Sequence, residues 1–168
     1  YCVEFALANR ALMMERVKTC LADICPGTIF DEMINIAHNY AALESHFGEQ
    51  VMVHRKGATK AFLDTVGIIP GSQGTHSYIV QGRGNPQSFM SCSHGAGRIM
   101  GRKQAIRQLD LAHEKGRLDR LGIVHAIRNK KDLDEASGAY KDVSEVMKNQ
   151  EDLVEILVEL TPLGVIKG

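Results

Sequence analysis

Glycine is concentrated in the middle of this chain. Of its 16 glycines, those at 57, 67, 71, 74, 82, 84, 95, 97 and 101 all lie between residues 54 and 101. Glycine weakens the interior of a helix or strand, and it allows tight turns and close approach of the backbone to a ligand. Short runs of β-forming residues at 68–69, 77–80 and 88–90 separate these glycines. We therefore predict a site built from loops on a small sheet.

Apolar periodicity predicts regular elements on both sides of the glycine-rich middle. Apolar residues recur at helical spacing over residues 2–24, and Pro26-Gly27 ends this first amphipathic helix. The other patterns predict, in order, a helix over 30–46, a strand at 51–53, a helix over 98–115 closed by Gly116, a strand over 121–127, an acidic turn over 132–138, a short helix at 143–147, a helix over 153–160 capped by Asn149, and a final strand over 162–168. Because no repeat or linker divides these elements, we expect a single compact α+β unit.

The overall charge is balanced, with 20 Lys and Arg against 20 Asp and Glu. Any anion site must therefore be a local patch. The four cysteines, Cys2, Cys20, Cys25 and Cys92, form no CxxC pair, which argues against a tetrahedral zinc site. Scattered thiols without a signal peptide favour a reducing, cytoplasmic location. No apolar run approaches the ~20 residues that a membrane span requires.

The segment Ser93-His94-Gly95-Ala96-Gly97-Arg98 places a histidine inside a turn of small residues. Such a histidine can coordinate a metal, transfer a proton or attack a phosphorus atom. Arg98 and Arg102 lie four residues apart, which puts both on one face of the predicted helix. Guanidinium groups suit phosphate oxygens, although a pair at this spacing is most often a solvated helix face.

Three other segments carry polar residues that suit a phosphate site. The loop Pro70-Gly71-Ser72-Gln73-Gly74-Thr75 can present N–H groups and hydroxyls to a phosphate, although a simple turn is the commoner reading. The cations of His54-Arg55-Lys56 precede Gly57, and His38-Asn39 lies in a helix-like stretch where a histidine is usually structural. Together these features favour nucleotidyl or phosphoryl transfer, in which charge stabilisation and positioning do most of the work.

Six separated segments, in this order, resemble the RtcB-type RNA-splicing ligases. They are His38-Asn39, residues 54–59, residues 70–75 with Ser77-Tyr78, residues 93–98, residues 138–141, and Lys167-Gly168. The resemblance is dense from about residue 36 to the end. It implies that residues 1–168 form the C-terminal part of a ligase catalytic domain, and the start at Tyr1, directly in a helix, leads us to expect a longer parent protein.

The resemblance also implies a reaction. Members of this family join RNA that ends in a 2′,3′-cyclic phosphate or 3′-phosphate to RNA with a 5′-hydroxyl, using GTP and Mn²⁺, and some use an archease-type activator. By motif, His94 is the histidine that takes GMP, His38 is a manganese ligand, and Arg98 and Arg102 hold RNA phosphate. The residues implied to contact the guanosine nucleotide are Asn39, Pro70, Gly71, Ser72, Gln73, Ser77, Gly95, Ala96, Gly97, Tyr140 and Lys167.

Two alternative functions stay open. The family's other metal ligands, an aspartate, a cysteine and two histidines, have no counterpart in this sequence, which favours a catalytically incomplete fragment that binds nucleotide or RNA. A metal-dependent phosphatase or cyclic phosphodiesterase could use the same phosphate-binding segments, because only the resemblance supplies the 5′-hydroxyl acceptor.

Overall fold

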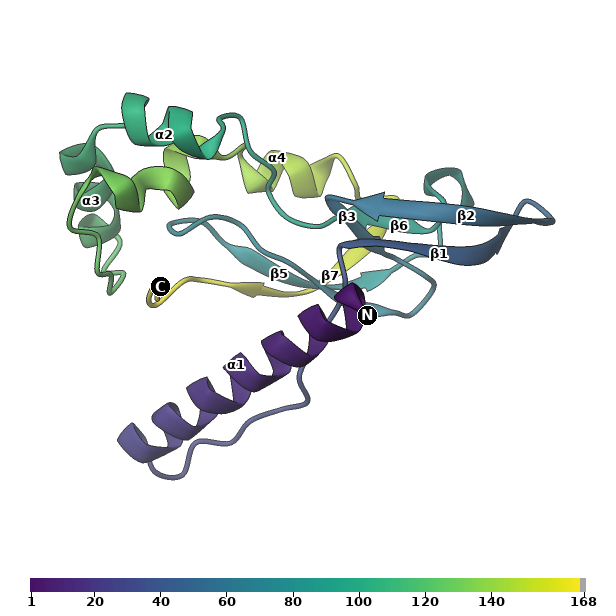
Figure 1. Cartoon of the computed structure of the whole chain (residues 1–168), viewed down its shortest axis with the longest axis horizontal. Coiled ribbons are helices and arrows are strands. Elements are labelled where there is room, and N and C mark those ends of the chain that lie inside the picture. The colour runs from purple at the N-terminus through teal and green to yellow at the C-terminus, as the bar shows by residue number, and fades with distance from the viewer. Residues whose placement is uncertain (167–168) are drawn as a thin grey trace.

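The computed structural model describes residues 1–166, which form helices and three small antiparallel sheets (Figure 1). The helices are α1 (Cys2–Ile24), α2 (Arg102–Gln108), α3 (Leu111–Arg120) and α4 (Val143–Lys148), with short 3₁₀ turns η1 (Pro86–Ser88), η2 (Lys130–Glu135) and η3 (Ser137–Ala139). The strands are β1 (Asn39–His46), β2 (Glu49–Lys56), β3 (Ala58–Lys60), β4 (Val66–Ile69), β5 (Ser77–Gly82), β6 (Ser91–Ser93) and β7 (Val154–Leu160). The predicted α+β class is confirmed.

The helix predicted over 30–46 is wrong. Residues 39–46 form β1, which pairs with β2 in an antiparallel hairpin, and residues 28–37 form neither helix nor strand. Phe47 and Gly48 turn the hairpin with φ of 54° and 84°, the left-handed pair that two-residue hairpin turns require. The even-numbered positions of β1 are the more buried ones, so the true period was two residues. The strand predicted at 51–53 is confirmed within β2.

The sheet β4–β5–β7 lies at the centre and carries the main core. Ile69, Tyr78, Val80 and Val154 are buried there, and Val143 from α4 packs on them. The strand pieces predicted at 68–69 and 77–80 are confirmed, whereas 88–90 spans the end of η1 and two left-handed residues before β6.

The helix predicted over 153–160 is wrong, because this segment is strand β7. It pairs along β5 from Ser77↔Leu160 to Gly82↔Val154. The alternation Val-Glu-Ile-Leu-Val-Glu-Leu places β-branched residues at every second position, and the free edge of β5 selects the extended form. Asn149 ends α4 and caps no following helix. The short helix predicted at 143–147 is confirmed as α4.

A helical lobe, residues 98–135, surrounds a second core that includes Leu118, Ile123 and Leu133. The predicted helix over 98–115 is divided here: α2 ends before the extended Leu109, and the carboxylate of Asp110 caps α3 by accepting from the N–H of His113 at 2.7 Å. The predicted acidic turn over 132–138 folds as η2 and η3.

The strands predicted near the lobe did not form. Residues 121–127 are not a strand, and Val124 makes only an isolated bridge to Gly164. That bridge is also the one strand-like contact of residues 162–166, where the final strand was predicted. Lys167 lies outside the described residues.

Gly122, and not Gly116, ends α3. Gly116 lies inside the helix, whereas Gly122 has a φ of 67° just after it. The N–H of Gly122 donates to the carbonyl of Asp119 at 3.1 Å, and the N–H of Ile123 donates to that of Leu118 at 3.0 Å. These two bonds are the pattern by which a left-handed glycine closes a helix.

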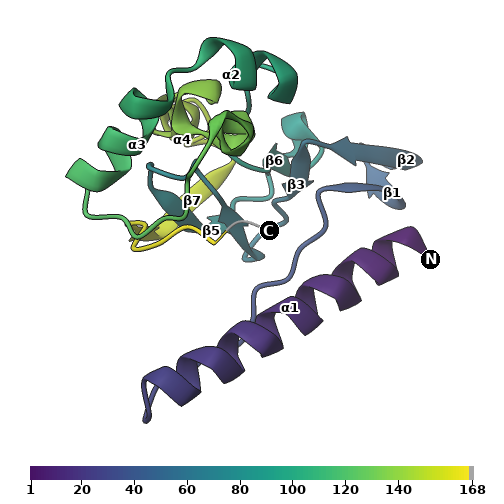
Figure 2. The ribbon, with the colours of Figure 1, turned by 60° about the vertical axis from the view of Figure 1, so that its left-hand side comes forward.

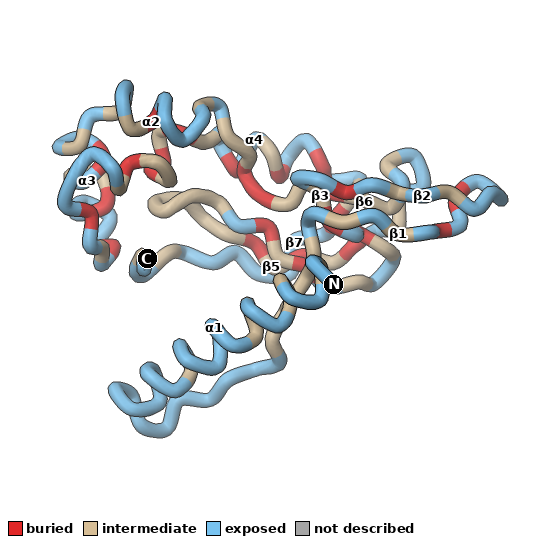
Figure 3. The backbone as a smooth tube through the Cα atoms, in the orientation of Figure 1, coloured by how far each residue is buried: buried red, intermediate tan, exposed pale blue. Residues whose placement is uncertain are grey.

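Helix α1, predicted over 2–24, is confirmed, and it has no buried residue (Figures 2 and 3). Its link to the sheets passes through Arg10, whose guanidinium donates to the side chain of Asn35 at 2.9 Å and to the carbonyl of Ile36 at 3.1 Å. Asn35 in turn donates to the carbonyl of Leu7 at 3.0 Å. Within residues 1–166, no helix combines the length and apolar character needed to cross a membrane.

A buried ion pair joins the β1–β2 hairpin to β6. Arg55, 2% exposed, donates to both carboxylate oxygens of Glu44 at 2.6 and 2.9 Å. The same guanidinium reaches the hydroxyl of Ser91 at 2.9 Å and the carbonyl of Phe89 at 2.9 Å. Hydrogen bonds from Arg55 lower the pKa of Glu44 to about 2 against the opposing effect of burial, and His46 adds a further contact at 2.9 Å. Arg55 is therefore a structural residue and not one of three solvated cations.

We expect acid to remove the stability that this ion pair contributes. Because the folded pKa of Glu44 lies below its usual value of 4.5, the contribution is complete above pH 4.5 and is lost as the pH falls toward 2. The expected loss is about 3 kcal/mol. Urea unfolding at pH 7, 4.5 and 2.5 measures it. Glu44→Gln should flatten this part of the pH profile, and an unchanged slope in that variant would contradict the assignment.

Gly116→Ala should stabilise the protein, because glycine is unfavourable inside a helix by about 0.5–1 kcal/mol relative to alanine. The added Cβ meets only the flexible end of Arg120, at 3.4 Å. Gly122→Ala is the matched control and should destabilise, since an L-residue is strained at its φ. Thermal unfolding of both variants distinguishes the two glycines. Destabilisation by Gly116→Ala would instead indicate that Gly116 ends the helix.

Candidate functional site

A cavity of about 440 Å³ opens where the glycine-rich loops meet the helical lobe. Nine of the predicted site residues line it, together with one that the sequence did not single out, Glu135. The predicted nine are Pro70, Gly71, His94, Gly95, Ala96, Gly97, Arg98, Arg102 and Tyr140. Residues from four separate segments of the chain therefore converge on one volume, which lies within the usual size range of ligand pockets.

The ring of His94 is held by the backbone of Gly57. Nδ1 lies 2.8 Å from the carbonyl oxygen of Gly57. A carbonyl oxygen only accepts, so Nδ1 carries the proton and the lone pair of the neutral ring is on Nε2. Gly57 has a φ of 70°, and its N–H donates to the carbonyl of His38 at 3.1 Å. The turn between β2 and β3 thus fixes both the orientation and the tautomer of His94.

His38 stacks on His94, with ring centroids 5.3 Å apart and an interplanar angle of 17°. Partial burial, the neighbouring His94 and Arg10 together lower the pKa of His38. Neutral imidazole is the form that binds metals. His38 and Asn39 do not line the cavity of His94; they border a smaller one, of about 230 Å³, between α1 and the start of β1.

The loop at 70–77 is closed by its own hydroxyl groups. The N–H of Gly71 donates to the hydroxyl of Ser77 at 3.2 Å, and the N–H of Ser72 donates to that of Thr75 at 2.6 Å. A Cβ on Gly71 would lie 2.1 Å from the carbonyl oxygen of His76, so only glycine fits there. The N–H groups of Gly71 and Ser72 are therefore already used within the loop. Ser72, Gln73 and Ser77 do not line the cavity of His94.

Gln73 offers an unused acceptor in the same loop. Its side-chain oxygen is buried and receives no hydrogen bond from residues 1–166. A buried acceptor without a donor costs free energy, so a ligand N–H that reached it would be favoured.

Glu135 ties the two predicted arginines to Tyr140. One carboxylate oxygen accepts from Arg98 at 2.8 Å and also from the Tyr140 hydroxyl, and the other accepts from Arg102 at 2.8 Å. Burial opposes ionisation of Glu135, but hydrogen bonds from Tyr140 and Arg102 and the charge of Arg98 outweigh it and lower its pKa. Burial and the contact with Glu135 raise the pKa of Tyr140.

Arg98 and Arg102 differ in the number of hydrogen bonds that each makes within the protein. Arg98 also donates to the carbonyls of Met100 and Asp134, and its guanidinium lies 4.8 Å from the centre of the Tyr140 ring. The side chain of Arg102 is 72% exposed and contacts Glu135 alone through Nε. The structure therefore leaves Arg102 the more accessible cation. The sequence did not indicate a role for Glu135, because the acidic residues at 132–138 predicted a turn. No regular spacing in the sequence links Glu135 to residues 98 and 102.

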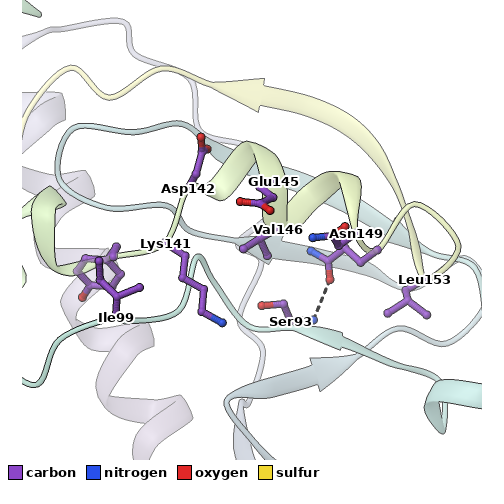
Figure 4. A pocket seen from close by; sticks show the side chains of 10 residues that line it. Ser93, Ile99, Lys141, Asp142, Glu145, Val146, Asn149 and Leu153 are labelled. Carbon is purple, nitrogen blue, oxygen red and sulfur yellow. Dashed lines mark hydrogen bonds between the residues drawn. The ribbon is translucent and has the colours of Figure 1, made fainter.

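A second cavity, of about 700 Å³, adjoins the first and shares Tyr140 with it (Figure 4). It lies along α4, and the Lys141 amine extends into it. The N–H of Ser93 donates to the side chain of the buried Gln150 at 2.9 Å, which fixes the strand that precedes His94.

The described residues do not form a complete metal centre. No group of three or more His, Cys, Asp or Glu side chains gathers within residues 1–166. The lowered pKa of His38 favours the neutral imidazole that binds metals, and its side chain is exposed.

A histidine with a free ring nitrogen can attack a phosphorus atom, and an accessible guanidinium suits phosphate oxygens. Comparison with known families adds an independent finding. The family model described as tRNA-splicing ligase RtcB matches residues 1–168. The chain belongs to the RtcB family.

Several curated relatives are named as ligases. The chain is 43% identical to the RNA-splicing ligase RtcB of Escherichia coli over 173 residues, which cover 98% of this chain and 41% of the relative. It is 37% identical over 185 residues to the RNA-splicing ligase RtcB of Mycobacterium tuberculosis, covering 98% and 42%. It is 35% identical over 190 residues to the tRNA-splicing ligase RtcB of Thermococcus kodakarensis, covering 98% and 39%. The chain thus spans about two fifths of the length of these relatives.

Arg98→Ala should destabilise the protein by about 2 kcal/mol or more, because it removes one donor from the half-buried Glu135 and breaks the hydrogen bonds to the carbonyls of Met100 and Asp134. Arg102→Ala removes a contact to the same carboxylate from a solvent-exposed side chain and should change stability little. Urea unfolding of the two variants gives the comparison. Equal effects would show that Arg98 has no special structural role.

Proposed function

We propose that this chain carries the nucleotidyl-transfer centre of an RNA ligase that uses GTP and Mn²⁺. The observation that carries the proposal is the Nδ1–Gly57 hydrogen bond of His94 at the cavity, which leaves Nε2 as the nucleophilic atom. Membership of the RtcB family and the ligase names of the relatives support it.

In the proposed first step, Nε2 of His94 attacks the α-phosphorus of GTP. An N–P bond forms as the bond between the α-phosphorus and the bridging oxygen breaks, and pyrophosphate leaves with that electron pair. The ring stays protonated at Nδ1, where the Gly57 carbonyl accepts the hydrogen bond and stabilises the positive charge that develops. A 3′-phosphate oxygen of RNA then displaces the imidazole, and a 5′-hydroxyl finally displaces GMP from the activated end.

The remaining cavity residues would bind and position the phosphates. Arg102 is the accessible guanidinium for an RNA phosphate, and Arg98 shapes the cavity through Glu135 and Tyr140. Gln73 lies outside this cavity, in the adjoining loop, and its unpaired buried acceptor would suit a donor on the guanine base. The guanosine contacts assigned by resemblance to Asn39, Ser72, Ser77 and Lys167 stay predictions, as does an archease-type activator.

His38 is proposed as one ligand of Mn²⁺. Its stacking on His94 would place the metal charge beside the nucleophile, where it disfavours protonation of the ring. When bound, such a cation neutralises charge on the triphosphate. The rest of its ligands would come from outside residues 1–166, consistent with the absence of a ligand cluster within them.

His94→Ala should abolish covalent labelling of the intact protein by α-³²P-labelled GTP in the presence of Mn²⁺, because no other described side chain offers a free imidazole nitrogen at this cavity. His113→Ala is the control: that histidine lies on the exposed surface of α3 and should leave labelling unchanged. Acid-labile, base-stable label in the wild type identifies a phosphoramidate. Persistent labelling of His94→Ala would refute the assignment.

A catalytically incomplete fragment that binds nucleotide or RNA is the second candidate, and the lack of a metal-ligand cluster within residues 1–166 favours it. The two candidates differ in what the 168-residue chain does alone. A covalent adduct with GTP and Mn²⁺ supports the transfer centre, whereas reversible binding without an adduct supports the fragment.

A further inference from the structure

Charge is unevenly distributed along this electrically neutral chain. The helical lobe, residues 98–135, holds ten of the 20 Lys and Arg and six of the 20 Asp and Glu. The lobe is therefore net positive and the rest of the chain net negative by the same amount. The lobe also borders the cavity of His94, since Arg98, Arg102 and Glu135 line that cavity.

The carboxylates of the lobe are engaged in its own folding. Asp110 caps α3, Glu114 is buried, and Asp119 pairs with His125 at 3.0 Å. Asp132 accepts from two backbone N–H groups at the start of η2, and Glu135 pairs with Arg98 and Arg102.

Apart from Arg102, the exposed cations of the lobe form no ion pair with the described residues. Among residues 1–166, no ion pair is formed by the exposed cations Lys103, Arg107, Lys115, Arg120, Lys130 and Lys131. Lysines and arginines elsewhere are paired more often, as in Arg55–Glu44 and Arg83–Glu155.

These cations lie on outward faces of packed elements. Ala105 is the buried residue of α2, and Lys103 and Arg107, one turn apart, fall on the opposite face. In α3 the buried pair is Glu114 and Leu118, and Arg120 projects from the other side. α2 and α3 lie together at one end of the molecule in both ribbon views (Figures 1 and 2). Arg102, which lines the cavity, is the first residue of α2 and directly precedes Lys103.

We propose that this lobe binds the sugar–phosphate backbone of the RNA whose end enters the cavity of His94. The inference rests on the proposed function and adds the surface that takes the body of the substrate. Residues 98–135 contain no Phe, Tyr or Trp, so base stacking on aromatic rings is not available. Contacts to phosphates alone position a strand without reading its sequence, and they release counterions, so binding should be sequence-independent and strongly salt-dependent.

The test compares two doubly neutralised variants of the intact protein, Lys103→Gln/Arg107→Gln in the lobe and Arg16→Gln/Lys148→Gln outside it. All four side chains are exposed and form no ion pair within residues 1–166, and the change in net charge is the same. The probe is a fluorescent 20-nucleotide single-stranded RNA with a 5′-hydroxyl and a 3′-phosphate. Anisotropy gives its Kd between 50 and 200 mM KCl.

We expect the lobe variant to bind at least tenfold more weakly at 100 mM KCl. The slope of log K against log[KCl] should fall by about 1.4, from about 0.7 for each lost contact with a single strand. The outer variant should match the wild type, and a second RNA of unrelated sequence should give the same results. Equal losses in both variants, or none in the lobe variant, would overturn the proposal, as would lobe-dependent binding of phosphatidylserine vesicles without binding of RNA.

Covalent labelling by GTP without RNA separates this inference from the proposed function. The lobe variant should label like the wild type, because its changed side chains do not line the cavity. A wild type that fails to label but shows lobe-dependent RNA binding would refute the transfer centre and keep the binding surface. Normal labelling together with RNA binding that does not depend on the lobe would support the transfer centre and refute the binding surface.

Discussion

The buried pair between Arg55 and Glu44 is the interaction on which the candidate site depends. A guanidinium that is almost fully removed from solvent must have all its donors satisfied, and here it joins a carboxylate of β1 to a hydroxyl and a carbonyl near β6. Two residues after Arg55, the chain makes the turn at Gly57 whose carbonyl holds His94. The hairpin, the turn at Gly57 and the ring of His94 are therefore connected through one charged cluster.

Much of the fold could be read from local patterns, and the failures have physical causes. The first helix, α4 and the short strands around the glycines follow from periodicity and turn chemistry. The segments 39–46 and 153–160 were misassigned because each gains its strand partner from another part of the chain, β2 in one case and β5 in the other. The residues of one segment do not show which distant strand will pair with it, and that pairing is what favours the extended form.

The sequence predicted which residues line the candidate site better than it predicted the contacts that hold them in place. Nine of the residues assigned by motif line one cavity. These motifs are spread over about 70 residues of the sequence, so their spacing alone does not bring them together. What the sequence did not indicate is how they are held. Gly57 as the acceptor for His94, the hydroxyl groups that close the 70–77 loop, and Glu135 between two arginines all arise from contacts between distant segments.

The carboxylate of Glu135 has a consequence for how any phosphate enters. Before a ligand arrives, the two guanidinium groups at the cavity share one carboxylate, so one of their two positive charges is already balanced. A phosphate that approached Arg102 would share this guanidinium with Glu135, to which Nε already donates. The negative charge of Glu135 would thereby weaken the binding of small anions and favour a ligand that is also held elsewhere along its length.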